Sequence, residues 1–387
     1  MIEKNSFHFA DLNVLGSFSV FSGSSGVNEY HFTLFPTRYG SFSQQIECVE
    51  RAYNKILKQV GIDEETCVFR RFFCSDLVNQ YEKIKDYPIA VNSKNNCSIS
   101  LISQTPYPYA KVALWAYHIS DSQQLRFSSD KGLIRGKLVH FWDTNIVCTE
   151  RETVYQQTEC ILSKYKKILE KRNMDFANNL IRTWFFIRNI DTNYKEFVEA
   201  RKKIFKENGL VPETHFVAST GVEGEFSDIR AKVLLDAYSI KGIEMGQLKY
   251  IKAPKYICPT YTYGVTFERG VVVNYRDRDH IFISGTASIN NKGEIVYYGE
   301  IEKQLEHTLK NIEILLSQAG RTFDDICIFI VYVRDNADAG FAYEEMRKRF
   351  MDTPVVVVCA NVCRPGWLIE IECQSVAKAS NDNLPFF

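Results

Sequence analysis

The sequence has no net charge and no long run of basic residues. Its 387 residues contain 47 Lys plus Arg and 47 Asp plus Glu, so the positive and negative charges balance. Proteins that bind nucleic acids usually carry an excess of basic side chains that neutralises phosphates. We therefore expect no nucleic-acid partner.

The sequence also has no segment typical of membrane or secreted proteins. No apolar run reaches the roughly 18–20 residues that cross a bilayer, and the first residues, MIEKNSFHFADL, do not resemble a secretory signal. The 11 cysteines are scattered, and an odd, scattered set favours reduced thiols over a disulfide framework. We therefore expect a cytoplasmic protein without a membrane partner.

Motifs for cofactors and metals are lacking. There is no P-loop and no dinucleotide-binding fingerprint. Cys359 and Cys363 are close in the chain, but no second Cys/His pair at zinc spacing lies nearby. We therefore expect neither a metal nor an organic cofactor.

Apolar residues are plentiful, and two stretches of the chain share one order of elements. Hydrophobic residues make up 45% of the sequence, which is enough for sizeable cores. In both stretches, helices with apolar residues at 3.6-residue spacing alternate with short strands of β-branched and aromatic residues. Copies about 146 positions apart indicate a duplicated domain, because solenoid repeats are about 20–50 residues long. In the first copy, a helix begins at Gln157 and is followed by the segments 180–191, 194–205 and 214–220. In the second copy, a helix begins at Gln304 and is followed by the segments 326–336, 341–350 and 353–362.

Strands are expected ahead of both copies, which predicts an α+β fold with helices packed on one face of each sheet. The Gly-rich, polar segment at 221–228 (GVEGEFSD) favours a boundary there. We expect a tandem pair of domains, residues 1–225 and 226–387.

The segment CRPGWLIEIEC near the C-terminus has the pattern of a site. Pro365-Gly366 forms a turn, and the strand after it places Glu370 and Glu372 on the same face. An arginine fork such as that of Arg364 binds carboxylates, and a partly desolvated glutamic acid transfers protons. The alternative is an exposed polar face with incidental pairing.

The second copy resembles the RidA/YjgF family, in which some members carry the name endoribonuclease. The resemblance rests on a helix followed by Ala-Gly, a strand ending in Tyr-Val-Arg-Asp, and an Arg ahead of a Glu-Ile-Glu strand. It implies mixed-sheet, chorismate-mutase-like domains, a homotrimer with sites between subunits, a carboxylate-binding role for Arg364 and an active-site role for Glu370. The balanced charge and the lack of an aromatic–basic stripe argue against ribonuclease activity.

From about residue 110 onward, the chain resembles the chorismatase family. These two-domain enzymes with RidA-like architecture cleave chorismate, releasing pyruvate with a dihydroxycyclohexadienoate or a hydroxybenzoate. The resemblance implies that Glu370 donates a proton to the enol ether, which requires burial to raise its pKa. Glu372 then has a structural role, or assists because its negative charge repels that of Glu370. The motifs are ALWAYH, RTWFFIRNIDTNY, FVASTGVEG, AYSIKGIEMGQL, YGVTFERG, ISGTASI, VYVRDNAD and CRPGWLIEIEC, in this order.

Two further arginines are candidates for binding the substrate's carboxylates. Arg182 lies inside an apolar strand, where a charge is costly unless it is paired. This indicates either a function or a buried salt bridge. Arg269 is the second candidate, with the alternative that it pairs with Glu268 or Glu225 at the surface.

Three other side chains complete the predicted site. Tyr263 and Thr220 offer hydroxyl groups, and Gly221 beside Thr220 permits close approach of the backbone. Cys363 directly before Arg-Pro resembles the chorismatase branch that forms 3-hydroxybenzoate, and a neighbouring arginine is expected to lower its thiol pKa. The alternative for Cys363 is an ordinary core cysteine. The competing functions are a RidA-type imine or enamine deaminase and a non-catalytic module that binds a small acid.

Overall fold

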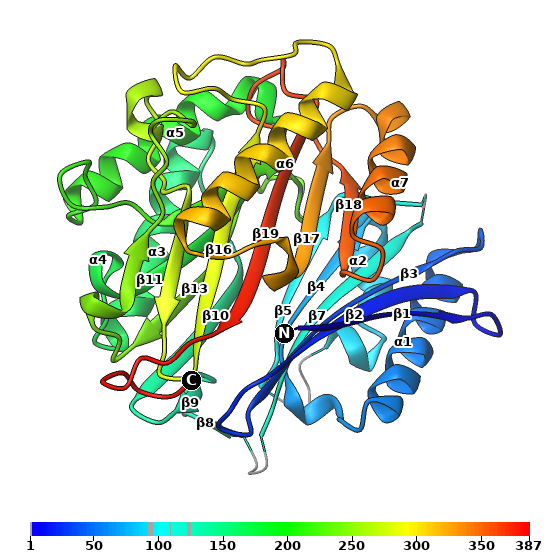
Figure 1. Cartoon of the computed structure of the whole chain (residues 1–387). Helices are drawn as coiled ribbons and strands as arrows, with labels where there is room; N and C mark the ends of the chain where they lie inside the picture. The colour runs from blue at the N-terminus through cyan, green and yellow to red at the C-terminus, as the bar shows by residue number, and fades with distance from the viewer. Residues whose placement is uncertain (1, 92–95, 109, 122–124) are drawn as a thin grey trace.

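The computed structural model describes residues 2–91, 96–108, 110–121 and 125–387 (Figure 1). It contains three mixed sheets with the strand orders β1-β2-β3-β7-β4-β5, β12-β11-β13-β10-β9-β8 and β14-β15-β16-β19-β17-β18-β6. When the second order is read backwards, all three sheets have the same topology, apart from the short β6 added to the third. The chain therefore contains three copies of one fold, which we call units 1, 2 and 3.

Unit 1 covers the first 120 residues. Its elements are β1 (Glu3–Phe9), β2 (Val14–Ser22), β3 (Asn28–Pro36), α1 (Phe42–Gln59), β4 (Cys67–Cys74), α2 (Leu77–Ile84), β5 (Ser98–Ser103) and β7 (Val112–Ser120). Between the last two lies β6 (Thr105–Tyr107), which pairs with β18 of unit 3 and so joins the two sheets.

Units 2 and 3 repeat this order, with a longer helix, α5 or α7, in the place of α2. Unit 2 comprises β8 (Arg126–Phe127), β9 (Leu133–Arg135), β10 (Leu138–Val147), α3 (Val154–Lys171), α4 (Phe176–Asn179), β11 (Leu180–Ile187), α5 (Ile190–Glu207), β12 (Ala218–Glu223) and β13 (Val233–Lys241). Unit 3 comprises β14 (Leu248–Tyr250), β15 (Gly270–Asn274), β16 (Arg278–Ala287), α6 (Ile301–Gln318), β17 (Ile326–Val333), α7 (Ala339–Arg349), β18 (Val355–Cys359) and β19 (Ile369–Lys378).

Local sequence signals start and stop the long helices. In α1, the Ser41 side chain accepts a hydrogen bond from the Gln44 backbone, and the Gln44 side chain accepts one from the Ser41 backbone. Thr153 and Gln156 form the same capping box at the start of α3. After α6, Gly320 adopts a φ of +68°, which a residue without a side chain adopts readily.

The α+β architecture with helices on one face of each sheet is confirmed, but the structure has three copies where the sequence repeat indicated two. The repeat relates units 2 and 3. The sequence repeat does not extend to unit 1, because the second helix of this unit, α2, has only 8 residues. The strand β13 lies beyond the expected boundary at residues 225/226 and pairs with β10 and β11, so the second sheet continues to Lys241.

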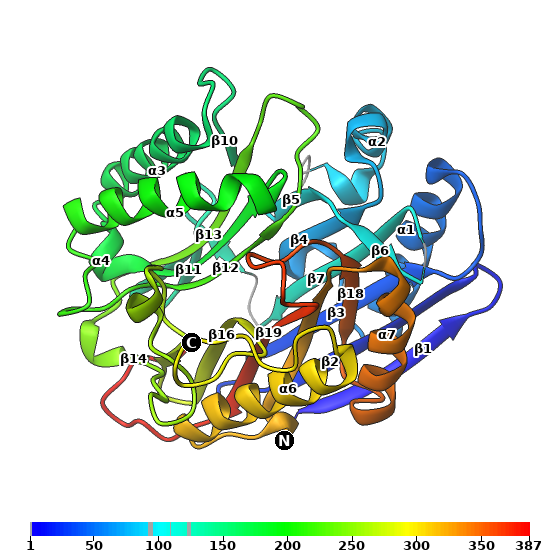
Figure 2. The ribbon, with the colours of Figure 1, turned by 90° about the horizontal axis from the view of Figure 1, so that it is seen from above.

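The three sheets pack against one another at the centre, and the helices lie outside (Figure 2). The contacts follow a cycle: β5 meets β10, β12 meets β16, and β17 meets β2 and β3. One hydrophobic cluster contains Trp115 of unit 1, Trp184 of unit 2 and Phe282 of unit 3. The units therefore surround one shared core, as three subunits would around an axis.

Two further observations bear on the expectations from the sequence. No helix within the described ranges is long and apolar enough to cross a bilayer. Cys148 and Cys160 form a disulfide between the end of β10 and α3, with Cα atoms 6.2 Å apart. The expectation of reduced thiols throughout is therefore wrong for this pair, because the fold brings two scattered cysteines together.

Candidate active site

A cavity of about 520 Å³ lies between units 2 and 3. Unit 2 contributes α5 and β12 to its walls, and unit 3 contributes β16, β19 and the segments before β15 and β19. The structure brings five of the seven predicted residues to this cavity: Tyr263, Arg269, Cys363, Arg364 and Glu370.

Glu370 is a buried acid that faces the cavity. It lies on β19, opposite Ala287 of β16 and Tyr332 of β17, and is 5% exposed. Burial raises its pKa to about 8, and the charge of Glu372 adds to the shift. A side chain at Gly285 would overlap the Glu370 carboxylate, so glycine at this position leaves room for the carboxylate as it lies here. At neutral pH the group is therefore a protonated acid, as a proton donor must be.

The raised pKa of Glu370 predicts a pH-dependent stability. The folded protein binds this proton more tightly than the unfolded chain, whose carboxyl has the ordinary pKa of 4.5. The free energy of unfolding, relative to that of Glu370→Gln, should therefore fall as pH rises from 4.5 to about 8, by about 1.4 kcal/mol per pH unit at most. Urea unfolding of both proteins between pH 5 and 9 measures this difference. A constant difference would contradict the shift.

Arg269 is buried against the cavity and forms no ion pair among the described residues. Its guanidinium donates to the Cys258 carbonyl at 2.8 Å and to the Tyr263 hydroxyl at 2.9 Å. The two expected surface partners are engaged elsewhere, since Glu268 accepts a backbone hydrogen bond and Glu225 pairs with Arg188. The positive charge of Arg269 is therefore left for the cavity.

Arg364 is held in place by its neighbours and forms no ion pair with another described residue. It donates to the Gly293 carbonyl at 2.9 Å. Its guanidinium lies 4.7 Å from the Tyr263 ring centroid and 4.9 Å from that of Trp367, which is cation–π geometry. These contacts fix the orientation of the guanidinium.

Arg201 on α5, which is not among the residues predicted from the sequence, is only 2% exposed and lines the cavity. Its Nε donates to Thr266 at 3.1 Å, while its Nη2 is buried without a hydrogen-bond partner in the described part of the chain. Burial lowers the pKa of this guanidinium. A signal was present, because Arg201 lies four residues from both Phe197 and Phe205 and so shares their buried helix face.

Cys363 lies in the cavity wall as a neutral thiol. Burial raises its pKa to about 12, the charge of Glu370 adds to this, and the Tyr194 hydroxyl is hydrogen-bonded to the sulfur. The expectation of a lowered thiol pKa is therefore wrong, because burial outweighs the charges of Arg364 and Arg201.

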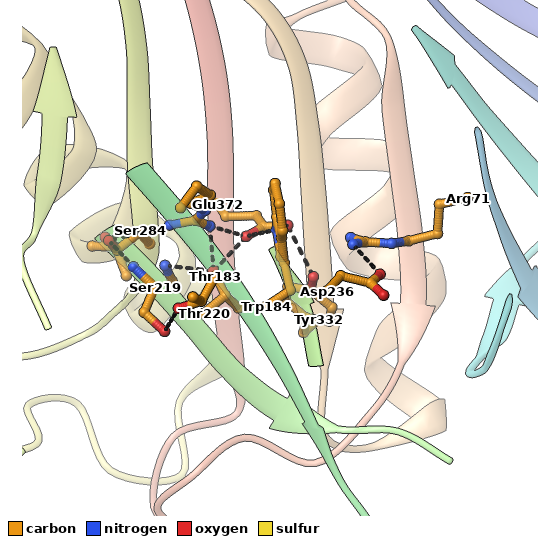
Figure 3. A network of polar contacts seen from close by, with 12 residues as sticks. Arg71, Thr183, Trp184, Ser219, Thr220, Asp236, Ser284, Tyr332 and Glu372 are labelled. Carbon is orange, nitrogen blue, oxygen red and sulfur yellow. Dashed lines mark hydrogen bonds and ion pairs between the residues drawn. The ribbon is translucent and has the colours of Figure 1, made fainter. Parts of the chain in front are cut away.

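Arg182 and Thr220 lie behind the cavity wall, where they surround the Glu372 carboxylate. Arg182 and Thr220 both hydrogen-bond Glu372 directly, and Trp184 Nε1 and the Tyr332 hydroxyl donate to it at 3.0 and 3.1 Å (Figure 3). The sequence indicated either a function or a buried salt bridge for Arg182, and the structure contains the salt bridge, with Glu372. Thr220 also accepts a 3.0 Å hydrogen bond from the Gly285 backbone, which tethers the strand beside Glu370.

The other two interfaces between units lack the acid. Each central strand pair, β4–β7, β11–β13 and β17–β19, has a register shift at the same place, which aligns the units residue by residue. In this alignment Glu372 corresponds to Asp236, which pairs with Arg71 at 2.9 Å (Figure 3). The positions that correspond to Glu370 are Leu234 and Ala113. Of these three equivalent positions, the one in unit 3 therefore carries an acid and the other two carry apolar side chains.

The comparisons with known proteins agree with the topology of unit 3. The family model described as Endoribonuclease L-PSP matches residues 269–377. A RutC family protein of Saccharolobus solfataricus is 30% identical over 129 residues, which cover 33% of this chain and 94% of that protein. This chain belongs to the RutC family. Another RutC relative, the 3-aminoacrylate deaminase RutC of Acinetobacter baylyi, is 27% identical over 93 residues, which cover 24% of this chain and 74% of that protein.

A larger likeness extends beyond the part shared with these RutC relatives. The crystal structure of a chorismatase matches with a TM-score of 0.61 and 17% identity, over 81% of this chain and 96% of that chain. At this identity the match shows a common fold. The expected chorismatase-type architecture is thereby confirmed for this RutC family member.

Proposed function

We propose that this protein cleaves the enol ether of chorismate. Pyruvate is released together with a hydroxybenzoate, with 3-hydroxybenzoate favoured, or with a dihydroxycyclohexadienoate. The observation that supports this most strongly is Glu370, a buried acid with a pKa of about 8 that faces a cavity containing Arg201, Arg269 and Arg364. An acid that stays protonated at neutral pH, among cations that pair with no carboxylate in the described ranges, suits an anionic substrate that must be protonated.

In the proposed reaction, the Glu370 carboxyl transfers its proton to the methylene carbon of the enolpyruvyl group. The C=C electrons form the new C–H bond, and the ether oxygen shares the positive charge as an oxocarbenium ion. In hydrolysis, water adds to the oxocarbenium carbon, and the hemiketal collapses to pyruvate and a ring alcohol. The hydroxybenzoate route adds no water overall, since pyruvate and hydroxybenzoate together contain the atoms of chorismate. Arg201, Arg269 and Arg364 would bind the two carboxylates.

Incubation of the purified full chain with chorismate tests the proposal. Pyruvate is followed with lactate dehydrogenase, and the ring product is identified by chromatography and mass spectrometry. Pyruvate formation that scales with enzyme concentration supports the proposal. Its absence at high enzyme concentration would contradict it.

Cys363 is expected to influence the product. We propose that the neutral thiol fills the cavity beside Glu370 and favours 3-hydroxybenzoate. The variant Cys363→Ala should therefore shift the product ratio several-fold towards the dihydroxy acid, because the smaller side chain leaves room for water. Product ratios are measured at equal conversion, with Cys48→Ala on α1 as the matched control. An unchanged ratio would assign Cys363 to packing alone.

A second candidate function is supported by the likeness to 3-aminoacrylate deaminase RutC. In this alternative, Arg364 binds one carboxylate and Glu370 positions water for hydrolysis of an imine or enamine. The three cavity arginines favour a substrate with more than one carboxylate, and therefore chorismate. Faster hydrolysis of 2-aminoacrylate than in buffer, without pyruvate release from chorismate, would reverse this preference. Saturable binding of a small aromatic acid without turnover of either compound would indicate the binding module instead.

The assembly and location of the protein are also proposals. The RidA-like resemblance implied a homotrimer, yet three units already surround one core within the chain. We therefore propose that one chain suffices to build the site. Most of the cysteines are free thiols, which favours the cytoplasm.

A further inference from the structure

A second hollow, which we call the polar basin, lies where the three units meet. It has a volume of about 320 Å³ and lies at the carboxyl ends of the parallel strand pairs β4–β5, β11–β12 and β17–β18. Such ends are a common place for ligands in sheets with parallel strands. Its lining residues include Ser103 and Gln104 of unit 1, Glu223 and Glu225 of unit 2, and Arg334 and Asn361 of unit 3.

Two oxygen atoms in the polar basin lack hydrogen-bond donors. Gln104 is 3% exposed, and its Nε2 donates to the Glu223 carbonyl, which leaves Oε1 buried without a partner in the described part of the chain. The same holds for Oε2 of Glu223. A buried acceptor without a donor destabilises the folded state. The basin is therefore built for a group that donates hydrogen bonds or carries positive charge.

The charge count of the polar basin leaves one negative charge unpaired. Glu225 pairs with Arg188 at 2.7 Å, and Arg334 pairs with Asp191 through two hydrogen bonds of 2.9 and 2.7 Å. Glu223 forms no ion pair with any described residue. Burial and the charges of Asp191 and Glu225 raise the pKa of its carboxyl, whereas a bound cation would favour the ionised form.

We propose that the polar basin binds a monovalent cation, K⁺ or an ammonium ion, through Glu223 and Gln104. Carboxylate and amide oxygens are the ligands that hard cations prefer. One carboxylate balances one positive charge, which favours a monovalent ion over Ca²⁺ or Mg²⁺. In the described part of the chain, no group of three acidic, Cys or His ligands lies close together at the basin, so the negative charge there suits an ion of low charge.

The basin is connected to the cavity by a short segment. The Asn361 side chain hydrogen-bonds the Glu223 carboxylate and lies 3.5 Å from an Asp191 oxygen, and its carbonyl accepts from the Glu223 backbone at 2.8 Å. Asp191 itself lines the cavity, and Cys363 follows Asn361 by two positions. A cation that orders Glu223 therefore orders the turn that carries Cys363 and Arg364.

Thermal unfolding of the full chain tests the site without requiring turnover. KCl and NH₄Cl, compared with tetramethylammonium chloride at equal ionic strength, should raise Tm by on the order of 2 °C. The shift should vanish in Glu223→Gln and persist in Glu213→Gln, an exposed glutamate of the same unit. The concentrations at half-maximal shift distinguish K⁺ from ammonium. Equal shifts in all three salts, or a shift retained in Glu223→Gln, would overturn the proposal, and a shift specific to Ca²⁺ or Mg²⁺ would overturn the charge argument.

Crystals soaked in thallium(I), an anomalous scatterer that replaces K⁺, provide a second measurement. A peak between Glu223 and Gln104 is expected in the wild type and not in Glu223→Gln. This result would stand even if chorismate proved not to be the substrate, and peaks at other sites alone would contradict the assignment.

Discussion

Substitution Glu370→Gln is expected to lower the rate of pyruvate release from chorismate by about 10²–10⁴-fold. Glutamine keeps the shape of the side chain but has no acidic proton to transfer to the enolpyruvyl carbon. The loss should appear in kcat, because the three cavity arginines, which we propose bind the carboxylates, are unchanged. Steady-state kinetics with the coupled pyruvate assay measure it.

The matched control for this experiment is Glu313→Gln, which removes an exposed carboxylate of α6 in the same unit. It should behave as the wild type. Thermal unfolding of Glu370→Gln should show an intact fold, since the wild-type acid is itself neutral at pH 7. More than one tenth of the wild-type kcat in Glu370→Gln would remove Glu370 from the role of proton donor.

Substitution Arg182→Met is expected to destabilise the protein by about 3–5 kcal/mol. The change leaves the Glu372 carboxylate buried at 4% exposure without its cation. Trp184, Tyr332 and Thr220 would still donate hydrogen bonds, but they do not neutralise the charge. Urea unfolding at pH 7 measures the loss.

The double variant Arg182→Met/Glu372→Leu separates charge burial from packing. Because it removes both ions, it should recover most of the stability that the single variant loses. Lys310→Met breaks the exposed pair with Glu313 and should cost less than about 1 kcal/mol. If Arg182→Met kept full stability and instead raised KM for chorismate, Arg182 would be a substrate ligand after all.

The parts of the fold that could be predicted are those with strong helical periodicity. The helices α3 and α6 have 18 residues each and occupy equivalent places in units 2 and 3, so their apolar faces made the repeat visible. In unit 1, α1 has the same length, but α2 is short and no second long helix follows it. The first strands of unit 2, β8 and β9, have only 2 and 3 residues. Strands this short leave no alternating pattern, so the start of unit 2 could not be placed.

The candidate site could be predicted where chemistry coincides with a family motif. Glu370, Cys363 and Arg364 belong to one short segment, and the strand geometry after Pro365-Gly366 already separates the faces. The opposite wall of the cavity comes from α5, about 170 positions earlier in the chain, and only the packing of units 2 and 3 reveals it. The pKa of Cys363 could not be predicted. The neighbouring arginine is visible in the sequence, but the burial that dominates this pKa is not.

The units within one chain also determine the stoichiometry of the site. In a trimer of identical subunits, any substitution appears at all three interfaces at once, so the interfaces remain chemically alike. Here the position of Glu370 is occupied by Leu234 and Ala113 at the other two interfaces. At this position, those two interfaces can therefore serve packing between units alone. One ligand should therefore saturate one chain, and isothermal titration with a substrate analogue should give a ratio of one rather than three.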